Sequence, residues 1–298
     1  MYATPVLFLI FNRPDTTQIV FDRIRQMQPA RLYVAADAPR RHKPGEAETC
    51  RQTRAIIDRV DWPCEVKKLY REENLGCKQS VSSAISWFFE HEEMGVILED
   101  DCLPDPSFFP FCEELLIKYK DDDRIGHIGG NCNLPGIVKG GLSYDFCSVT
   151  HIWGWATWRR VWKNMDVNFP FWEECRARRS WLFRNKWEEI YFSSFISDAL
   201  YQRHGLNPWG VFYYYMLRTQ NQLSVYPAVN LVTNIGLGNP EATHTTGKSR
   251  KLYVPSEKMA FPLRHPAYVM DNRQINKAAV KHSFFSYKRL LRYFLGLY

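Results

Sequence analysis

The sequence contains no long uninterrupted apolar run. No stretch of about 18 consecutive apolar residues, the length that spans a bilayer, occurs in the 298-residue chain, so we expect no transmembrane helix. The first residues lead directly into a strand-like apolar run, without the basic-then-apolar order of a secretion signal. We therefore expect a cytoplasmic protein.

The eight cysteines are widely spaced and form no C-x-x-C pair. This pattern argues against a cysteine metal motif and against the dense disulfide framework of a small secreted protein. Free, mostly buried thiols are expected instead. Hydrophobic residues make up 45% of the chain, which is enough to build a large core and argues against disorder.

Acidic residues are scarce in the C-terminal stretch, which carries much of the net charge of +7. Its cations alternate with aromatic and aliphatic residues and are Lys277, Lys281, Lys288, Arg289 and Arg292. This composition is typical of a helix that lies on a membrane surface and meets anionic head groups. A terminal helix docked on its own domain would have the same composition, so both interpretations stay open.

A second basic and aromatic segment lies further upstream. Its cations are Arg176, Arg178, Arg179, Arg184 and Lys186. Nucleic-acid binding is conceivable for such a cluster, but the sequence has no recognisable nucleic-acid-reading motif. We therefore expect no nucleic-acid partner.

The first hundred residues alternate between apolar runs of strand length and helical segments. The runs cover residues 6–11, 32–36, 66–70 and 96–98, and amphipathic or capped helical segments separate them. Such alternation predicts an α/β fold with a Rossmann-like, mostly parallel sheet and helices on both faces. Ligands of such sheets bind beyond the carboxyl ends of the strands.

Polar side chains follow each of the four expected strands. They are Arg13, Asp37, Asn74 with Lys78, and the adjacent acids Glu99, Asp100 and Asp101. Because the carboxyl ends of parallel strands meet at one edge, these groups should converge on one crevice. Three adjacent acids are often only a solvated loop, but carboxylates this close raise each other's pKa unless a cation neutralises them. Oxygen ligands of this kind suit Mg²⁺ or Mn²⁺.

Several short segments together resemble a known family. They are FLIFNRP at 8–14, ADAPR at 36–40, NLGCK at 74–78, LEDDC at 98–102, WGWATW at 153–158, NIGLG at 234–238 and THT at 243–245. This set resembles the bacterial nucleotide-diphospho-sugar transferases, which are glycosyltransferases of the GT-A fold, are described as hemolytic-protein-like and are distantly similar to N-acetylglucosaminyltransferase I. The resemblance covers roughly residues 5–246.

The resemblance implies a division of the chain and a metal site. Residues 1–246 would form the GT-A domain, with a nucleotide-sugar-binding half at 1–103 and an acceptor-side half at 104–246, followed by a basic aromatic tail at 247–298. Asp101 and His244 would hold the divalent metal, Mn²⁺ or Mg²⁺, between the phosphates of the donor. The loop that carries His244, from 236 to 247, could close over the donor.

The resemblance also implies roles for the donor-binding residues. Glu99 would reach the transferred sugar, and Asp100 the ribose or a metal-bound water. Arg13 and Lys78 would place positive charge near the base or the phosphates, unless they are ordinary solvated residues at helix starts. Asp37 would accept the N3 proton of uracil, which favours UDP, and Asn74 belongs to the same donor-binding set.

The acceptor side depends on aromatic residues and on a general base. Trp153 and Trp155 are expected to stack on acceptor sugars, whereas Trp158 and Trp162 fit helix-spaced core positions. An inverting transferase needs a carboxylate that removes the acceptor proton. Relatives carry an acid after the tryptophan where this chain has Gly210. Asp198 is the nearest replacement, and Glu173 and Glu174 are further candidates.

The sequence therefore predicts a metal-dependent, inverting glycosyltransferase that uses a nucleotide-sugar donor, favouring UDP. The acceptor would be a saccharide or a lipid-linked saccharide in bacterial surface polysaccharide synthesis, with the enzyme cytoplasmic and peripheral on the inner face of the plasma membrane. A catalytically silent UDP-sugar-binding relative is a first alternative, because Gly210 replaces the expected acid. A sugar-phosphate nucleotidyltransferase is a second, although the first strand is followed by Asn12-Arg13-Pro14 rather than by a glycine-rich loop.

Overall fold

The chain folds around an eight-stranded mixed sheet with the strand order β3-β2-β1-β4-β8-β6-β9-β7. The computed structural model describes residues 1–169, 171–177, 183, 185–201, 208–237, 253–284 and 287–296. The strands of this sheet are β1 (Val6–Ile10), β2 (Arg31–Ala36), β3 (Glu65–Tyr70), β4 (Met94–Glu99), β6 (Ile125–Gly129), β7 (Tyr144–Cys147), β8 (Trp155–Trp158) and β9 (Leu223–Pro227). A two-stranded antiparallel sheet joins β5 (Cys102–Pro104) to β10 (Val232–Asn234).

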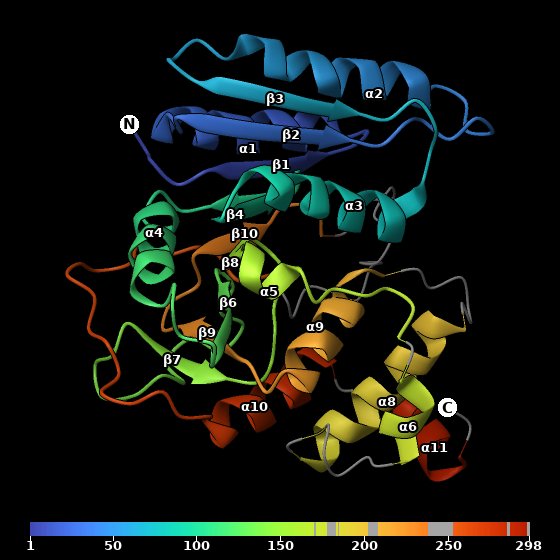
Figure 1. The fold of residues 1–298 in the computed structure, drawn as a ribbon, viewed down its shortest axis with the longest axis vertical. Helices are drawn as coiled ribbons and strands as arrows, with labels where there is room; N and C mark the ends of the chain where they lie inside the picture. Colours follow the sequence, from blue (N-terminus) through green and yellow to red (C-terminus); the bar gives the residue numbers. More distant parts are fainter. Residues whose placement is uncertain are drawn as a thin grey trace.

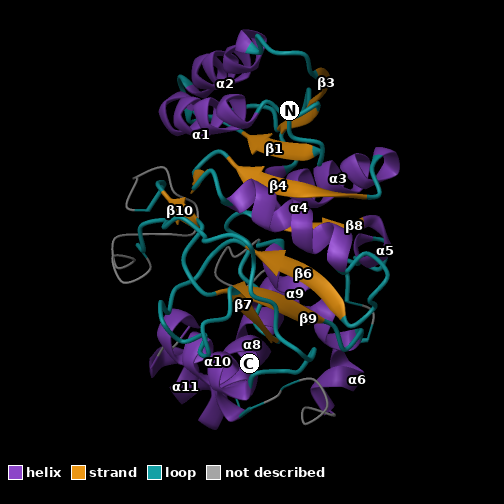
Figure 2. Cartoon of the chain, turned by 90° about the vertical axis from the view of Figure 1, so that its left-hand side faces the viewer, coloured by secondary structure: helices purple, strands orange, loops and turns teal. Residues whose placement is uncertain are grey.

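The helices lie on both faces of the sheet. They are α1 (Pro14–Met27), α2 (Glu46–Ala55), α3 (Gly76–His91), α4 (Phe108–Lys118), α5 (Arg159–Trp162), α6 (Trp172–Ala177), α8 (Lys186–Leu200), α9 (Gly210–Thr219), α10 (Arg273–Ala279) and α11 (Tyr287–Phe294), with a 3₁₀ turn η1 (Ile56–Arg59) and a π-helical turn η4 (Val280–Phe284). In Figure 2, α1 and α2 lie on one side of the N-terminal strands and α3 lies on the other.

The first half of the chain forms the parallel part of the sheet. β3, β2, β1 and β4 pair in parallel, and every residue of β1 is buried, as expected for a strand covered on both faces. Figure 1 shows these four strands together towards one end of the molecule. β6 and β9 add a further parallel pair, while β8 and β7 are antiparallel to their neighbours. The predicted α/β class with a Rossmann-like, mostly parallel sheet is confirmed.

Two apolar clusters form the core, and helix α9 contributes to both. The larger cluster follows the sheet and includes Tyr213 of α9, whereas the smaller one, which includes Phe212 of α9, involves α8, α9 and α10. Residues beyond position 246 take part in both clusters: Met259 lies in the larger and Ile275 in the smaller. The expected domain boundary at this position stays a prediction.

All eight cysteines are free thiols, and Cys50, Cys102, Cys112, Cys132 and Cys147 are buried, as the sequence predicts. Within the described parts of the chain, no helix combines the length and apolar character that a bilayer crossing requires.

Candidate active site

The acidic triplet lies where the central parallel strands end. β4 ends at Glu99, and Asp100 and Asp101 form the turn into β5. The neighbouring strand β1 leads to Arg13, which precedes the first residue of α1. Arg13 Nη1 lies 2.7 Å from Asp101 Oδ2 and 3.7 Å from Asp100 Oδ1. Arg13 and Asp101, which are 88 positions apart in the sequence, therefore meet at the carboxyl ends of the central strands.

The electrostatics of this cluster favour a bound cation. Burial raises the pKa of the Glu99 carboxyl, and the negative charges of Asp101 and Asp100 raise it further. Burial, followed by the charge of Asp101, likewise raises the pKa of Asp100, while Arg13 opposes both shifts. The single positive charge of Arg13 does not offset three clustered carboxylates, so a further cation would stabilise their ionised forms.

The chain returns to Asp101 through β10 and the residues after it. The backbone N–H of Ile235 donates to the Asp101 carbonyl at 2.8 Å, and Asn234 Nδ2 lies 3.5 Å from Asp101 Oδ1. At Gly236, an added Cβ would lie 2.4 Å from Asp101 Oδ2. Glycine is therefore required by the close approach of this segment to the carboxylate.

The predicted second metal ligand, His244, lies outside the described residues, as does most of the 236–247 loop. The described residues nevertheless bring the start of that loop, through Gly236, directly against Asp101.

The residues of the cluster fit a divalent cation that is held largely by its substrate. Within the described ranges, no group of three or more His, Cys, Asp or Glu side chains is arranged to hold a metal ion by itself. Mg²⁺, however, is commonly bound by one or two carboxylates together with substrate phosphates and water. Asp101 meets this requirement, whereas Asp100 Oδ2 already accepts the backbone N–H of Phe11 at 3.1 Å.

Asp37 caps the start of α3. Its Oδ1 accepts from the backbone N–H groups of Ala38 and Leu75, both at 3.0 Å. Its Oδ2 accepts from the Gly76 N–H at 3.0 Å and from Asn74 Nδ2 at 3.2 Å. A carboxylate has about four acceptor sites, and all of them are used here. The expectation that Asp37 accepts the uracil N3 proton is therefore wrong.

Asn74 supports the same cap. Its Nδ2 also donates to the Ala38 carbonyl at 2.6 Å, which ties the segment before α3 to the end of β2. Asn74 thus positions the helix start in this structure. The remaining predicted donor residue, Lys78, lies in the first turn of α3, and its Nζ lies 4.7 Å from the centre of the Phe212 ring of α9. Lys78 therefore reaches from the parallel half of the sheet to α9.

The expectation that Trp155 stacks on an acceptor sugar is wrong. Trp155 is 0% exposed in β8, and its ring stacks on His127 at 5.4 Å and on Trp209 at 5.7 Å. Trp158 and Trp162 are also buried, which confirms the core interpretation for these two. Trp153 is partly buried, and its role in acceptor binding stays a prediction.

The expectation that Asp198 is the general base is also wrong. Asp198 is buried in α8, and its two oxygens accept from Nη1 and Nη2 of Arg292 in α11, both at 2.8 Å. Both oxygens are thus held in a bidentate ion pair and are closed to a substrate proton. The other candidates, Glu173 and Glu174, are exposed on α6, and Glu173 accepts a hydrogen bond from Tyr201.

Gly210, where the resemblance to the transferases implies an acid, begins α9. An added Cβ there would lie 2.6 Å from Ile152 Cδ1. A side chain at this position would therefore require the end of the Ile152 side chain to move.

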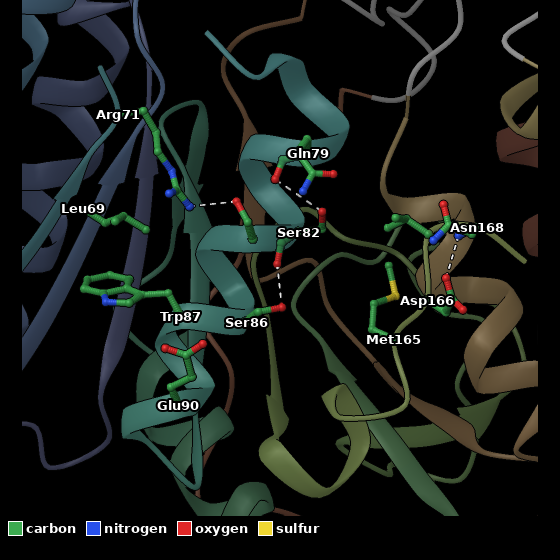
Figure 3. A pocket seen from close by; sticks show the side chains of 12 residues that line it. Leu69, Arg71, Gln79, Ser82, Ser86, Trp87, Glu90, Met165, Asp166 and Asn168 are labelled. Atoms are coloured by element: carbon green, nitrogen blue, oxygen red, sulfur yellow. Dashed lines mark hydrogen bonds between the residues drawn. The ribbon is translucent and has the colours of Figure 1, made fainter. Parts of the chain in front are cut away.

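Sequence reasoning missed a groove along the outer face of α3. It has a volume of about 540 Å³ and is lined by Arg71, Ser83, Ser86 and Trp87, and on the opposite side by Asp166 and Asn168 (Figure 3). Arg71 Nη2 donates to Ser83 Oγ at 2.9 Å. The groove thus presents hydroxyl, amide and indole groups. The serine-rich pattern of residues 80–86 was the available signal in the sequence.

The comparisons with known proteins assign no family. No protein-family model matches the chain, and no curated protein matches it in sequence.

Solved structures show only loose similarity. HddC from Yersinia pseudotuberculosis is 9% identical, with a TM-score of 0.33 over 53% of this chain and 78% of that one. The 4-diphosphocytidyl-2C-methyl-D-erythritol synthase from Anaerococcus prevotii is 8% identical, with a TM-score of 0.34 over 65% and 84%. A UDP-glucose pyrophosphorylase in complex with UDP-glucose is 10% identical, with a TM-score of 0.26 over 50% and 58%. Similarity this loose leaves the function of the site to be argued from its own residues.

Proposed function

We propose that the protein is a metal-dependent glycosyltransferase that moves a sugar, with inversion, from a UDP-sugar to a saccharide or lipid-linked acceptor. The observation that carries this proposal is the meeting of Arg13, Asp101 and Gly236 at the carboxyl edge of β1 and β4. This edge is where α/β sheets bind nucleotides.

The charges at this edge fit a nucleoside diphosphate with its counter-ion. The buried carboxylates near Asp101 call for a cation, and a diphosphate supplies further oxygen ligands for one. Arg13, held by Asp101 at 2.7 Å, contributes fixed positive charge beside the same position. A sugar monophosphate would supply fewer oxygen ligands for that cation.

Asp101 would hold Mn²⁺ or Mg²⁺, and we propose His244 as the second protein ligand. The bound metal would offset negative charge on the departing nucleoside diphosphate. Close contact between Gly236 and Asp101 would place the start of the 236–247 loop beside the donor.

For the acceptor, we propose the groove along α3 together with Trp153. The groove begins near Arg71, directly after β3, and offers polar side chains with the indole of Trp87. Asp198 is paired to Arg292, and of the other candidates that the sequence suggested we propose Glu173 or Glu174 as the base. We further propose that the reaction takes place in the cytoplasm during assembly of bacterial surface polysaccharide.

Calorimetric titration of UDP with and without Mn²⁺ tests the donor site. We expect Mn²⁺-dependent binding that is lost in Asp101→Ala and retained in Asp121→Ala, a control acid whose side chain is 87% exposed. Metal-independent binding, or no binding, would overturn the proposal. Incubation with UDP-sugars and acceptor saccharides then separates transfer, which releases UDP, from two other outcomes. Binding without turnover indicates the silent relative, and release of pyrophosphate from UTP and a sugar phosphate indicates a nucleotidyltransferase.

A further inference from the structure

Helix α11 presents a row of large apolar side chains to solvent. Tyr287, Leu291 and Phe294 are 78%, 62% and 71% exposed, and Leu295, directly after the helix, is 60% exposed. Their spacing of four, three and one residues places them on one side of the helix. A folded protein rarely exposes so many large apolar groups side by side unless they meet something apolar.

The opposite side of α11 is fixed to α8, so the direction of the apolar row is determined. Arg292 binds both oxygens of Asp198 at 2.8 Å. Tyr293 is buried, and its hydroxyl donates to Glu189 and accepts from Lys186. These contacts hold the helix on the domain while Leu291 and Phe294 face outward. The apolar row is therefore a fixed part of the surface of the folded protein.

The chain around this row is strongly basic. Residues 273–298 contain no Asp or Glu and carry Arg273, Lys277, Lys281, Lys288, Arg289 and Arg292. Among the cations whose exposure the structure describes, Arg273, Lys277, Lys281 and Lys288 are exposed. Each cation near an anionic membrane surface adds to binding, and exposed apolar side chains can enter the acyl boundary.

The position of α11 in the molecule suits contact with a flat surface. Figure 1 shows α10 and α11 at the end of the molecule furthest from α2 and β3, and α11 packs against α8. A membrane at this end would leave the α2 and β3 end directed away from the lipid.

We propose that α11 and the exposed cations of 273–288 dock the protein on an anionic lipid surface. A second copy of the chain fits less well, because a symmetric pair would set this acid-free basic segment against itself. The inference does not depend on the proposed transferase activity, but it would place the enzyme beside lipid-linked acceptors.

Sedimentation of the whole chain with vesicles tests the proposal. The vesicles are made of phosphatidylcholine alone, or of phosphatidylcholine mixed with phosphatidylglycerol, at about 0.1 M and about 1 M salt, where screening differs strongly. We expect binding to the anionic vesicles at low salt. The double variant Leu291→Ser/Phe294→Ser should weaken it about tenfold or more, since it removes the apolar insertion. The double variant Lys277→Glu/Lys288→Glu should weaken it and reduce its salt dependence.

The test includes a matched control variant, and either of two results would contradict the lipid-docking proposal. Ile117→Ser changes another exposed apolar residue, 55% exposed on α4, and should leave binding unchanged. Thermal unfolding of each variant confirms that it is folded. Absence of binding to anionic vesicles would overturn the proposal. So would a concentration-dependent dimer in sedimentation equilibrium that the Leu291→Ser/Phe294→Ser variant abolishes, because that result assigns the surface to a second copy.

Discussion

Asp37 and Asp101 are both aspartates that follow a parallel strand, yet their surroundings give them different capacities. Asp37 accepts four hydrogen bonds from the chain itself and is buried at the start of α3. Asp101 faces Arg13 and lies beside two further acids. The first carboxylate completes a helix cap, whereas the second retains charge that a cation can bind.

Replacing Asp37 should therefore cost stability rather than nucleotide affinity. We expect Asp37→Ala to lower the free energy of unfolding by about 1–2 kcal/mol, since it leaves N–H groups at the start of α3 without their acceptor. Urea unfolding followed by circular dichroism measures this change. Asp121→Ala, at an exposed position, serves as the control and should unfold like the parent protein. A stable Asp37→Ala protein that no longer binds UDP would show that Asp37 contacts the nucleotide after all.

At the scale of elements, the β5–β10 pair holds the Asp101 turn against the segment that starts at Asn234. The two strands pair through Cys102 and Asn234, so Ile235 is hydrogen-bonded to the Asp101 backbone carbonyl and Gly236 lies against the carboxylate. The parallel strands place Asp101 at the sheet edge, and this small antiparallel sheet brings the loop to it.

Adding one methyl group at this contact should impair the site without unfolding the protein. In Gly236→Ala the new Cβ would lie 2.4 Å from Asp101 Oδ2, so the loop or the carboxylate must shift. We expect Mn²⁺-dependent UDP binding to weaken about tenfold or more, a change of at least about 1.4 kcal/mol on the binding scale. Calorimetric titration measures the loss.

A second glycine variant separates this effect from general backbone strain. Gly136 has a positive φ of +78°, and apart from its chain neighbours no described residue lies within 4 Å of the position that an added Cβ would take. Gly136→Ala therefore strains the backbone without crowding a neighbour. Equal loss of UDP binding in both variants would refute the argument from the Asp101 contact.

The sequence is sufficient to predict those strands and helices whose residue pattern lies within one short segment. Apolar runs of strand length identify β1 to β4, and the polar residues after them include Arg13 and Asp101, which the structure brings together. The misassigned residues depend on distant partners. The carboxylate of Asp198 is taken by Arg292, 94 positions later in the chain. Trp155 lies in a strand buried on both faces, where no alternation distinguishes a core side from an exposed one.

At the scale of the whole molecule, α9 joins the two parts of the core. Tyr213 and Met216 pack in the cluster around the sheet, whereas Phe212 and Tyr215 pack in the cluster with α8 and α10. A single helix with buried residues on both sides gives the two clusters a shared element. Loss of packing in one cluster therefore disturbs the helix that the other cluster requires.

We expect this shared helix to make unfolding cooperative despite the length of 298 residues. Unfolding curves in urea should coincide when followed by tryptophan fluorescence and by far-ultraviolet circular dichroism, which is the mark of a single transition. Met216→Ala removes buried volume from the larger cluster and should destabilise by about 2–5 kcal/mol. Both curves should shift together, while Ile117→Ala, at a site 55% exposed, should move neither. Two separate transitions, with Met216→Ala affecting one alone, would show that the clusters unfold independently and that α9 does not couple them.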